Sequence, residues 1–111
     1  GLTVVRQAEF AQSVYHLFVI LAHDRDGLQK YLGETGVGTG LHYPLPLHLQ
    51  KAYAHMGYQK GDFPASEKTA ERLLSLPMYA ELTVDQIERV AACIKEYVTG
   101  SRCEAQGLRQ G

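Results

Sequence analysis

The apolar residues of this chain fall into short continuous runs and longer periodic stretches. The runs predict strands. Residues 14–21 are mostly β-branched, aliphatic or aromatic, and their continuous apolar character is typical of a strand buried on both faces. Residues 37–42 and 74–76 are shorter and are also expected to be extended. Residues 1–13 have no clear period, so we expect a lead-in segment there.

Helical spacing of apolar residues first occurs in residues 25–35. Asp24 is a suitable N-cap for this helix, and Gly36 is a suitable C′ glycine for its end. A second, shorter helix is expected over residues 49–56, with Gly57 ending it.

Two further helices are predicted nearer the C-terminus. Pro64 suits the first position of a helix that continues to about residue 73. Thr83, with Gln86 three residues later, is a capping-box signature for a helix that extends to residue 98. The apolar stripe of this last helix is expected to face the core and comprises Val84, Ile87, Val90, Ala91, Ile94 and Val98.

The predicted order is strand, helix, strand, loop, helix, strand, helix. This order indicates an α/β or α+β fold, in which a small sheet of about three strands is covered by helices. Residues 14–98 are expected to form one domain, and the Gly-, Gln- and Arg-rich residues 99–111 are expected to form a disordered tail.

Length and charge argue against several classes of protein. A chain of 111 residues is the size of a single domain, and a net charge of −1 disfavours nucleic acid as a partner. No apolar run reaches the length of a membrane span, so no membrane partner is expected. Cys93 and Cys103 do not make a disulfide framework, and we expect two free thiols and a cytoplasmic location.

Candidate chemistry is concentrated in residues 36–50, which combine three glycines, two prolines, two histidines and a tyrosine. The glycine triplet faintly suggests a dinucleotide-binding loop, which requires a helix to begin at the glycines. Pro44 and Pro46 follow immediately, and each disfavours a helical conformation in the residue before it. The block is therefore interpreted as a rigid segment that presents imidazole and phenol groups rather than as a nucleotide loop.

Four segments, in order and spacing, resemble the small C-terminal domain of the DegT/DnrJ/StrS aminotransferases. They are VYHLFVI at 14–20, GTGLHYPLPLHLQ at 38–50, LSLPMY at 74–79 and LTVDQI at 82–87. The resemblance implies a pyridoxal-phosphate enzyme of fold type I that aminates keto-sugars carried on nucleoside diphosphates. It also implies a large domain that holds the cofactor, and a dimer with active sites at the subunit interface.

The resemblance places the Schiff-base lysine and the cofactor-binding residues in a large domain that this sequence does not include. The five lysines here lie in predicted helices or polar turns, where none has a dry pocket for imine chemistry. Pyridoxal phosphate is therefore expected in the complete enzyme and not on this chain alone, which is predicted to be inactive. We expect the chain to dock on the large domain, or to self-associate through the docking face left bare without it.

The candidate substrate-binding residues are His42, Tyr43, His48 and His16. Residue types alone favour a structural role for the first two, in which they bond nearby backbone and hold the proline turn. The resemblance favours contact with the nucleotide sugar, because imidazole and phenol donate to sugar and phosphate oxygens. His48 ranks below these two, and His16 within an apolar strand is more typical of a buried core residue.

Two other interpretations remain open at this point. The first is a free-standing binding module derived from such an enzyme, which keeps the fold and has lost catalysis. The second is a metal site among His42, His48 and His55, but their spacing is wider than that of usual zinc ligands. Glu67 and Glu71 are interpreted as a solvated helix face rather than as catalytic carboxylates.

Overall fold

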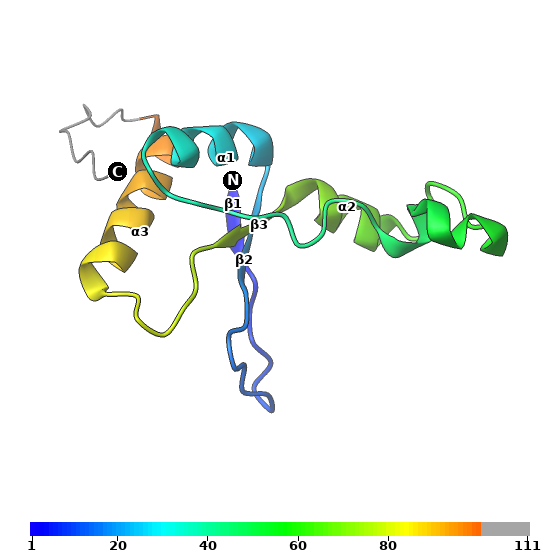
Figure 1. Cartoon of the computed structure of the whole chain (residues 1–111), viewed down its shortest axis with the longest axis horizontal. Helices are drawn as coiled ribbons and strands as arrows, with labels where there is room; N and C mark the ends of the chain where they lie inside the picture. Colours follow the sequence, from blue (N-terminus) through cyan, green and yellow to red (C-terminus); the bar gives the residue numbers. More distant parts are fainter. Residues whose placement is uncertain (101–111) are drawn as a thin grey trace.

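A computed structural model describes residues 1–100 of the chain. Figure 1 shows a small central sheet, with two helices on one side and a long extension that leads away from it. In chain order the elements are β1 (Leu2–Val4), β2 (Phe18–Ala22), α1 (Arg25–Glu34), the 3₁₀ helices η1 (Leu47–Leu49) and η2 (Lys51–Met56), α2 (Pro64–Arg72), β3 (Leu73–Leu76) and α3 (Val84–Thr99).

The three strands form an antiparallel sheet in the order β1-β2-β3. Ile20 of β2 pairs with Val4 on one side and with Leu74 on the other, and alternate residues of each strand share a face. The core lies on the face of Ile20 and Leu74, where α1 contributes Leu28 and Leu32. Partly buried residues of α3 pack against the same cluster, so α1 and α3 cover this face. The expected three-stranded sheet covered by helices is confirmed.

The helix ends follow the local signals in the sequence. The Asp24 side chain accepts a hydrogen bond from the Gly27 amide, and Gly36 has the positive φ of a C′ glycine. Pro64 occupies the first turn of α2. Thr83 and Gln86 form the capping box at the start of α3. These predictions are confirmed because a cap depends only on residues within one turn of the chain.

The strand predicted over residues 14–21 is wrong in its first half. Residues 14–17 belong to the hairpin loop (residues 5–17) that joins β1 to β2, and Val14 is 93% exposed. His16 is therefore exposed in a loop and is not buried within a strand. The lead-in expected over residues 1–13 contains β1, which forms only because β2 pairs with it.

Three other expectations need correction. Residues 37–42 do not form a strand, and only Gly40 makes a bridge, with Ser75 of β3. The helix expected over residues 49–56 consists of two 3₁₀ segments. The stripe of α3 faces the core only in part, because Ile87 and Val98 are about half exposed and line an apolar groove between α3 and the sheet. Most of the tail prediction lies outside the described residues, although α3 itself extends to Thr99.

The described chain is more extended than a compact domain. Its radius of gyration is 16.4 Å, whereas a compact chain of this length has about 13 Å. The hairpin loop and a second extension, the arm (residues 42–63), project from the sheet (Figure 1). Apolar side chains at their surfaces are exposed, among them Phe10, Leu47 and Met56. Within residues 1–100, no helix combines the length and the apolar character needed to cross a bilayer.

Candidate functional site

The histidine and tyrosine block begins at the free edge of β3. The Gly40 amide donates to the Ser75 carbonyl at 3.0 Å, and the Ser75 amide donates to the Gly40 carbonyl at 2.8 Å. This pair of hydrogen bonds fixes the chain against the sheet just before His42. The block therefore starts from a rigid element, although it continues into the arm.

His42 is held by a side chain that lies 33 residues later in the sequence. Its Nδ1 atom is 2.9 Å from the Oγ atom of Ser75, which is only 2% exposed. The His42 ring also lies over Gly40: a Cβ atom at position 40 would be 2.7 Å from Cε1 of the ring. The absence of a side chain at Gly40 thus leaves the space that the imidazole occupies.

Tyr43 follows with its ring edge-on to His42, at a centroid distance of 5.5 Å and an interplanar angle of 80°. The residue is 72% exposed. Within residues 1–100, its hydroxyl group has no hydrogen-bond partner. The phenol is therefore available to a ligand or to another protein surface.

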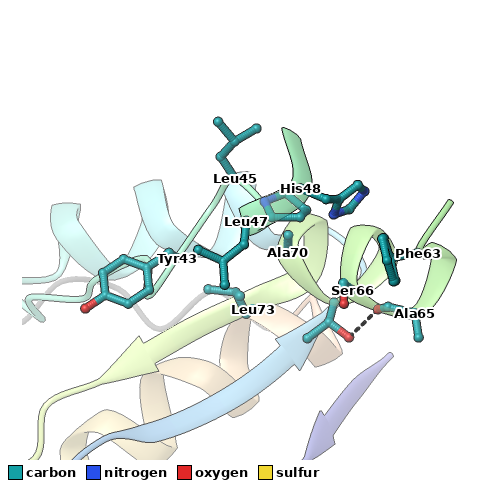
Figure 2. A pocket seen from close by; sticks show the side chains of 11 residues that line it. Tyr43, Leu45, Leu47, His48, Phe63, Ala65, Ser66, Ala70 and Leu73 are labelled. Carbon is teal, nitrogen blue, oxygen red and sulfur yellow. Dashed lines mark hydrogen bonds between the residues drawn. The ribbon is translucent and has the colours of Figure 1, made fainter. Parts of the chain in front are cut away.

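A groove of about 580 Å³ extends from Tyr43 between the arm and α2. Figure 2 shows the Tyr43 ring at one end of this groove and the His48 ring near Phe63 at the other. Most of the lining is apolar, and its polar members include Ser66 and Thr69.

His48 is packed inside the arm rather than presented to solvent. Its side chain is 7% exposed and lies edge-on to Phe63 at 4.8 Å. Its Nε2 atom is 3.5 Å from Oε1 of Glu67, an atom that also accepts a hydrogen bond from the Gly61 amide at 2.7 Å. Because the Glu67 side chain is only 12% exposed, its interpretation as part of a solvated helix face is wrong.

The four candidates are thus not brought to one point. His42 and Tyr43 are adjacent at the sheet edge, and His48 lies at the far end of the groove. His16 lies in the hairpin loop and does not line this groove. Sequence reasoning missed Ser75, although a serine between two leucines in a predicted strand is a signal of a buried polar contact.

The described residues do not fit a pyridoxal-phosphate site. All five lysines are exposed, so none has the enclosed surroundings in which a lysine amine forms an imine readily. Within residues 1–100, no group of three or more His, Cys, Asp or Glu side chains is arranged to hold a metal ion. Cys93 is a buried free thiol, and Cys103 lies outside the described residues.

Comparison with known proteins supports one family. The model of the DegT/DnrJ/EryC1/StrS aminotransferase family matches residues 1–95. A pleiotropic regulatory protein of Geobacillus stearothermophilus is 46% identical over 76% of this chain and 23% of its own length. The dTDP-3-amino-3,6-dideoxy-alpha-D-galactopyranose transaminase of Aneurinibacillus thermoaerophilus is 38% identical over 76% of this chain and 23% of its own length.

Solved structures agree. The structure of S. venezuelae DesV in complex with a ketimine intermediate matches with a TM-score of 0.85 at 34% identity, over 94% of this chain and 28% of DesV. An aminotransferase from Brucella abortus matches with a TM-score of 0.78 at 32% identity, over 86% of this chain and 26% of its own. The chain spans about a quarter of the length of these relatives. The family match, together with the agreement in fold, confirms the resemblance seen in the sequence: the chain belongs to the DegT/DnrJ/EryC1/StrS aminotransferase family.

Proposed function

We propose that the chain acts as the small domain of an aminotransferase that aminates a nucleotide-linked keto-sugar. In this proposal His42 and Tyr43 contact the substrate, while the reactive lysine and pyridoxal phosphate belong to a large domain outside this sequence. Transaminases of dTDP- and UDP-linked sugars among the relatives support this substrate class.

The observation that carries the proposal is the pair of polar rings at the edge of β3. His42 is anchored through Nδ1, so its Nε2 atom is left for a ligand. The Tyr43 hydroxyl is unpartnered within the described residues, and the residue is exposed. An imidazole and a phenol at this edge can hydrogen-bond to sugar hydroxyls or phosphate oxygens. In this proposal His48 holds the arm against α2. Any direct contact of His48 with the substrate would lie at the end of the groove away from Tyr43. His16 stays a prediction.

The apolar surfaces support the presence of a larger partner domain. The hairpin loop and the arm expose apolar side chains far from the core, including Phe10, Leu47 and Met56. Exposed apolar area of this kind usually marks a contact surface. We propose that the large domain covers these two extensions, and that they mediate self-association when that domain is absent.

The test is a titration of ¹⁵N-labelled chain with UDP-N-acetylglucosamine and with dTDP-glucose, followed by amide shifts. We expect shifts concentrated in residues 41–50. Tyr43→Phe and His42→Gln each remove one hydrogen-bonding group and should weaken binding by about two- to tenfold, since one such bond contributes about 0.5–1.5 kcal/mol. His55→Gln, at an exposed histidine of η2, is the matched control and should leave the affinity unchanged.

Shifts that are absent, or that fall outside the block in the wild-type chain, would contradict substrate contact by these residues. Binding by a chain that functions in cells without any larger domain would support the free-standing module instead. A blot of source cells with an antibody against the chain separates these cases by the size of the natural product.

A further inference from the structure

The contact between His42 and Ser75 raises the question of which group donates the hydrogen. The Oγ atom of Ser75 is a donor and an acceptor, and a neutral imidazole carries its proton on only one of its two nitrogens. The direction of this hydrogen bond therefore decides which nitrogen of His42 is protonated. It also decides whether the other ring nitrogen, Nε2, is a donor or an acceptor.

The burial of Ser75 decides the direction. Only 2% of the residue is exposed, so water does not readily satisfy its hydroxyl group. Within residues 1–100, His42 Nδ1 is the one hydrogen-bond partner of Ser75 Oγ. If Nδ1–H donated to Oγ, the hydroxyl hydrogen would be buried without an acceptor, which is the costly arrangement. If the hydroxyl donates to Nδ1, its hydrogen is satisfied and the proton of the neutral ring lies on Nε2.

The backbone from which the Ser75 side chain projects is itself held in place. Both backbone hydrogen bonds of Ser75 to Gly40 are formed, and Gly40 is the residue over which the His42 ring lies. Ser75 thus aligns the chain before His42 through its backbone hydrogen bonds. The Ser75 side chain orients the His42 ring.

We propose that Ser75 is a positioning residue that holds His42 in the Nε2–H tautomer and presents a single N–H donor from the sheet edge. The acceptor that this donor fits is an oxygen of a sugar or a phosphate. This last step rests on the proposed substrate contact, whereas the tautomer itself does not. A group that only accepts hydrogen bonds, such as a phosphate oxygen, matches this arrangement, and a group that only donates does not.

The experiment measures the tautomer directly. Long-range ¹H–¹⁵N correlation spectra of the chain at about pH 9, where imidazole is neutral, separate protonated from unprotonated ring nitrogens. We expect His42 to show one tautomer with Nδ1 unprotonated, and the exposed His55 to show a mixture. Ser75→Ala should convert His42 to a mixture like that of His55. Ser75→Cys keeps a similar side-chain shape but has a much weaker hydrogen-bond donor, so it should also convert His42 to a mixture of tautomers. This second variant tests the proposal even if Ser75→Ala does not fold.

A protonated Nδ1 in the wild-type chain, or an unchanged tautomer in both variants, would overturn the proposal. The titration with UDP-N-acetylglucosamine and dTDP-glucose supplies the second readout. Ser75→Ala should weaken binding by about threefold or more when His42 is present, and by nothing further in the His42→Gln background. A wild-type chain that shows the single tautomer but binds neither nucleotide sugar would refute the proposed substrate contact while supporting the role of Ser75.

Discussion

Gly40→Ala tests whether the space above residue 40 is what lets His42 reach Ser75. The added Cβ atom would lie 2.7 Å from His42 Cε1 and 3.3 Å from Nδ1. Non-bonded carbon atoms are comfortable at about 3.5 Å or more, so the ring must withdraw by about 0.8 Å or rotate away. The backbone adds no further strain, because Gly40 is not among the glycines with positive φ.

The magnitude follows from what the displaced ring leaves behind. The Nδ1 to Oγ distance is 2.9 Å, so a displacement of this size removes a hydrogen bond of good geometry. The buried Ser75 hydroxyl group then lacks a partner, which costs about 1–3 kcal/mol. Alanine offsets about 0.4–1 kcal/mol of this by restricting the unfolded chain. We expect a net loss of about 1–2 kcal/mol.

Urea unfolding of four chains isolates this effect: wild type, Gly40→Ala, Ser75→Ala and the double variant. Without the Ser75 hydroxyl group, Gly40→Ala should cost nothing or stabilise slightly. Gly38→Ala is the matched control, because its Cβ atom would meet nothing within 4 Å. The reasoning is refuted if Gly40→Ala has the same effect in both backgrounds, since the methyl group would then act on something other than the His42–Ser75 contact.

Leu32→Ala truncates a fully buried side chain of α1 and should lower the free energy of unfolding by about 2–5 kcal/mol. The control Lys30→Ala, at an exposed residue of α1, should change the free energy of unfolding by less than about 0.5 kcal/mol. Similar losses for Leu32→Ala and Lys30→Ala would mean that α1 is not packed on the sheet. Thr83→Ala removes the capping box of α3 and should cost about 0.5–2 kcal/mol in the same assay, whereas an unchanged midpoint would show that the cap does not stabilise the fold. Hydrogen bonds from Tyr97 and from the Gly27 amide lower the pKa of Asp24, so its stabilising effect is present above about pH 4 and is lost as the pH falls through the lowered pKa. The stability difference between wild type and Asp24→Asn should therefore shrink on acidification, and a constant difference would argue against the charge as its source. With pyridoxal phosphate, glutamate and a nucleotide-linked keto-sugar, the chain alone should give no transamination, and measurable turnover would refute the placement of the reactive lysine elsewhere.

The helices of this fold could be predicted from sequence because their signals are local. Asp24 and Gly36 bracket α1, and Thr83 with Gln86 begins α3, all within one turn of the helix ends. The strands depend on distant partners and were predicted less well. β1 has only three residues, and nothing in its own sequence indicates that it pairs with β2. The apolar run over residues 14–17 suggested burial, but those residues lie in an exposed loop.

The sequence predicts which residues carry the chemistry of the site but not how they are arranged. The block around His42 stands out because glycine, proline, histidine and tyrosine occur together there. The geometry of the block cannot be predicted in this way, because Ser75 lies 33 residues from His42 and contacts it only after β3 joins the sheet. His48 lies close to His42 in the sequence, but the arm places it against Glu67. Spacing along the chain thus identified the candidate residues and could not say which of them face the same point.

The apolar residues of this chain serve two different purposes, and for this reason their pattern predicts some elements correctly and others wrongly. A small group, including Ile20, Leu32 and Leu74, is almost fully buried and holds the sheet to α1 and α3. A second group lies on the hairpin loop and the arm, where it contributes little to that core and leaves the chain more extended than a compact domain. Hydrophobic pattern alone cannot separate residues that stabilise the fold from residues that contact another surface. His42 is hydrogen-bonded to Ser75 in the buried sheet, and the next residue, Tyr43, belongs to the exposed arm. The candidate site therefore lies where the rigid core meets the surface that is proposed to contact the large domain. The core would position a substrate contact there, and the domain proposed to cover the arm would complete it.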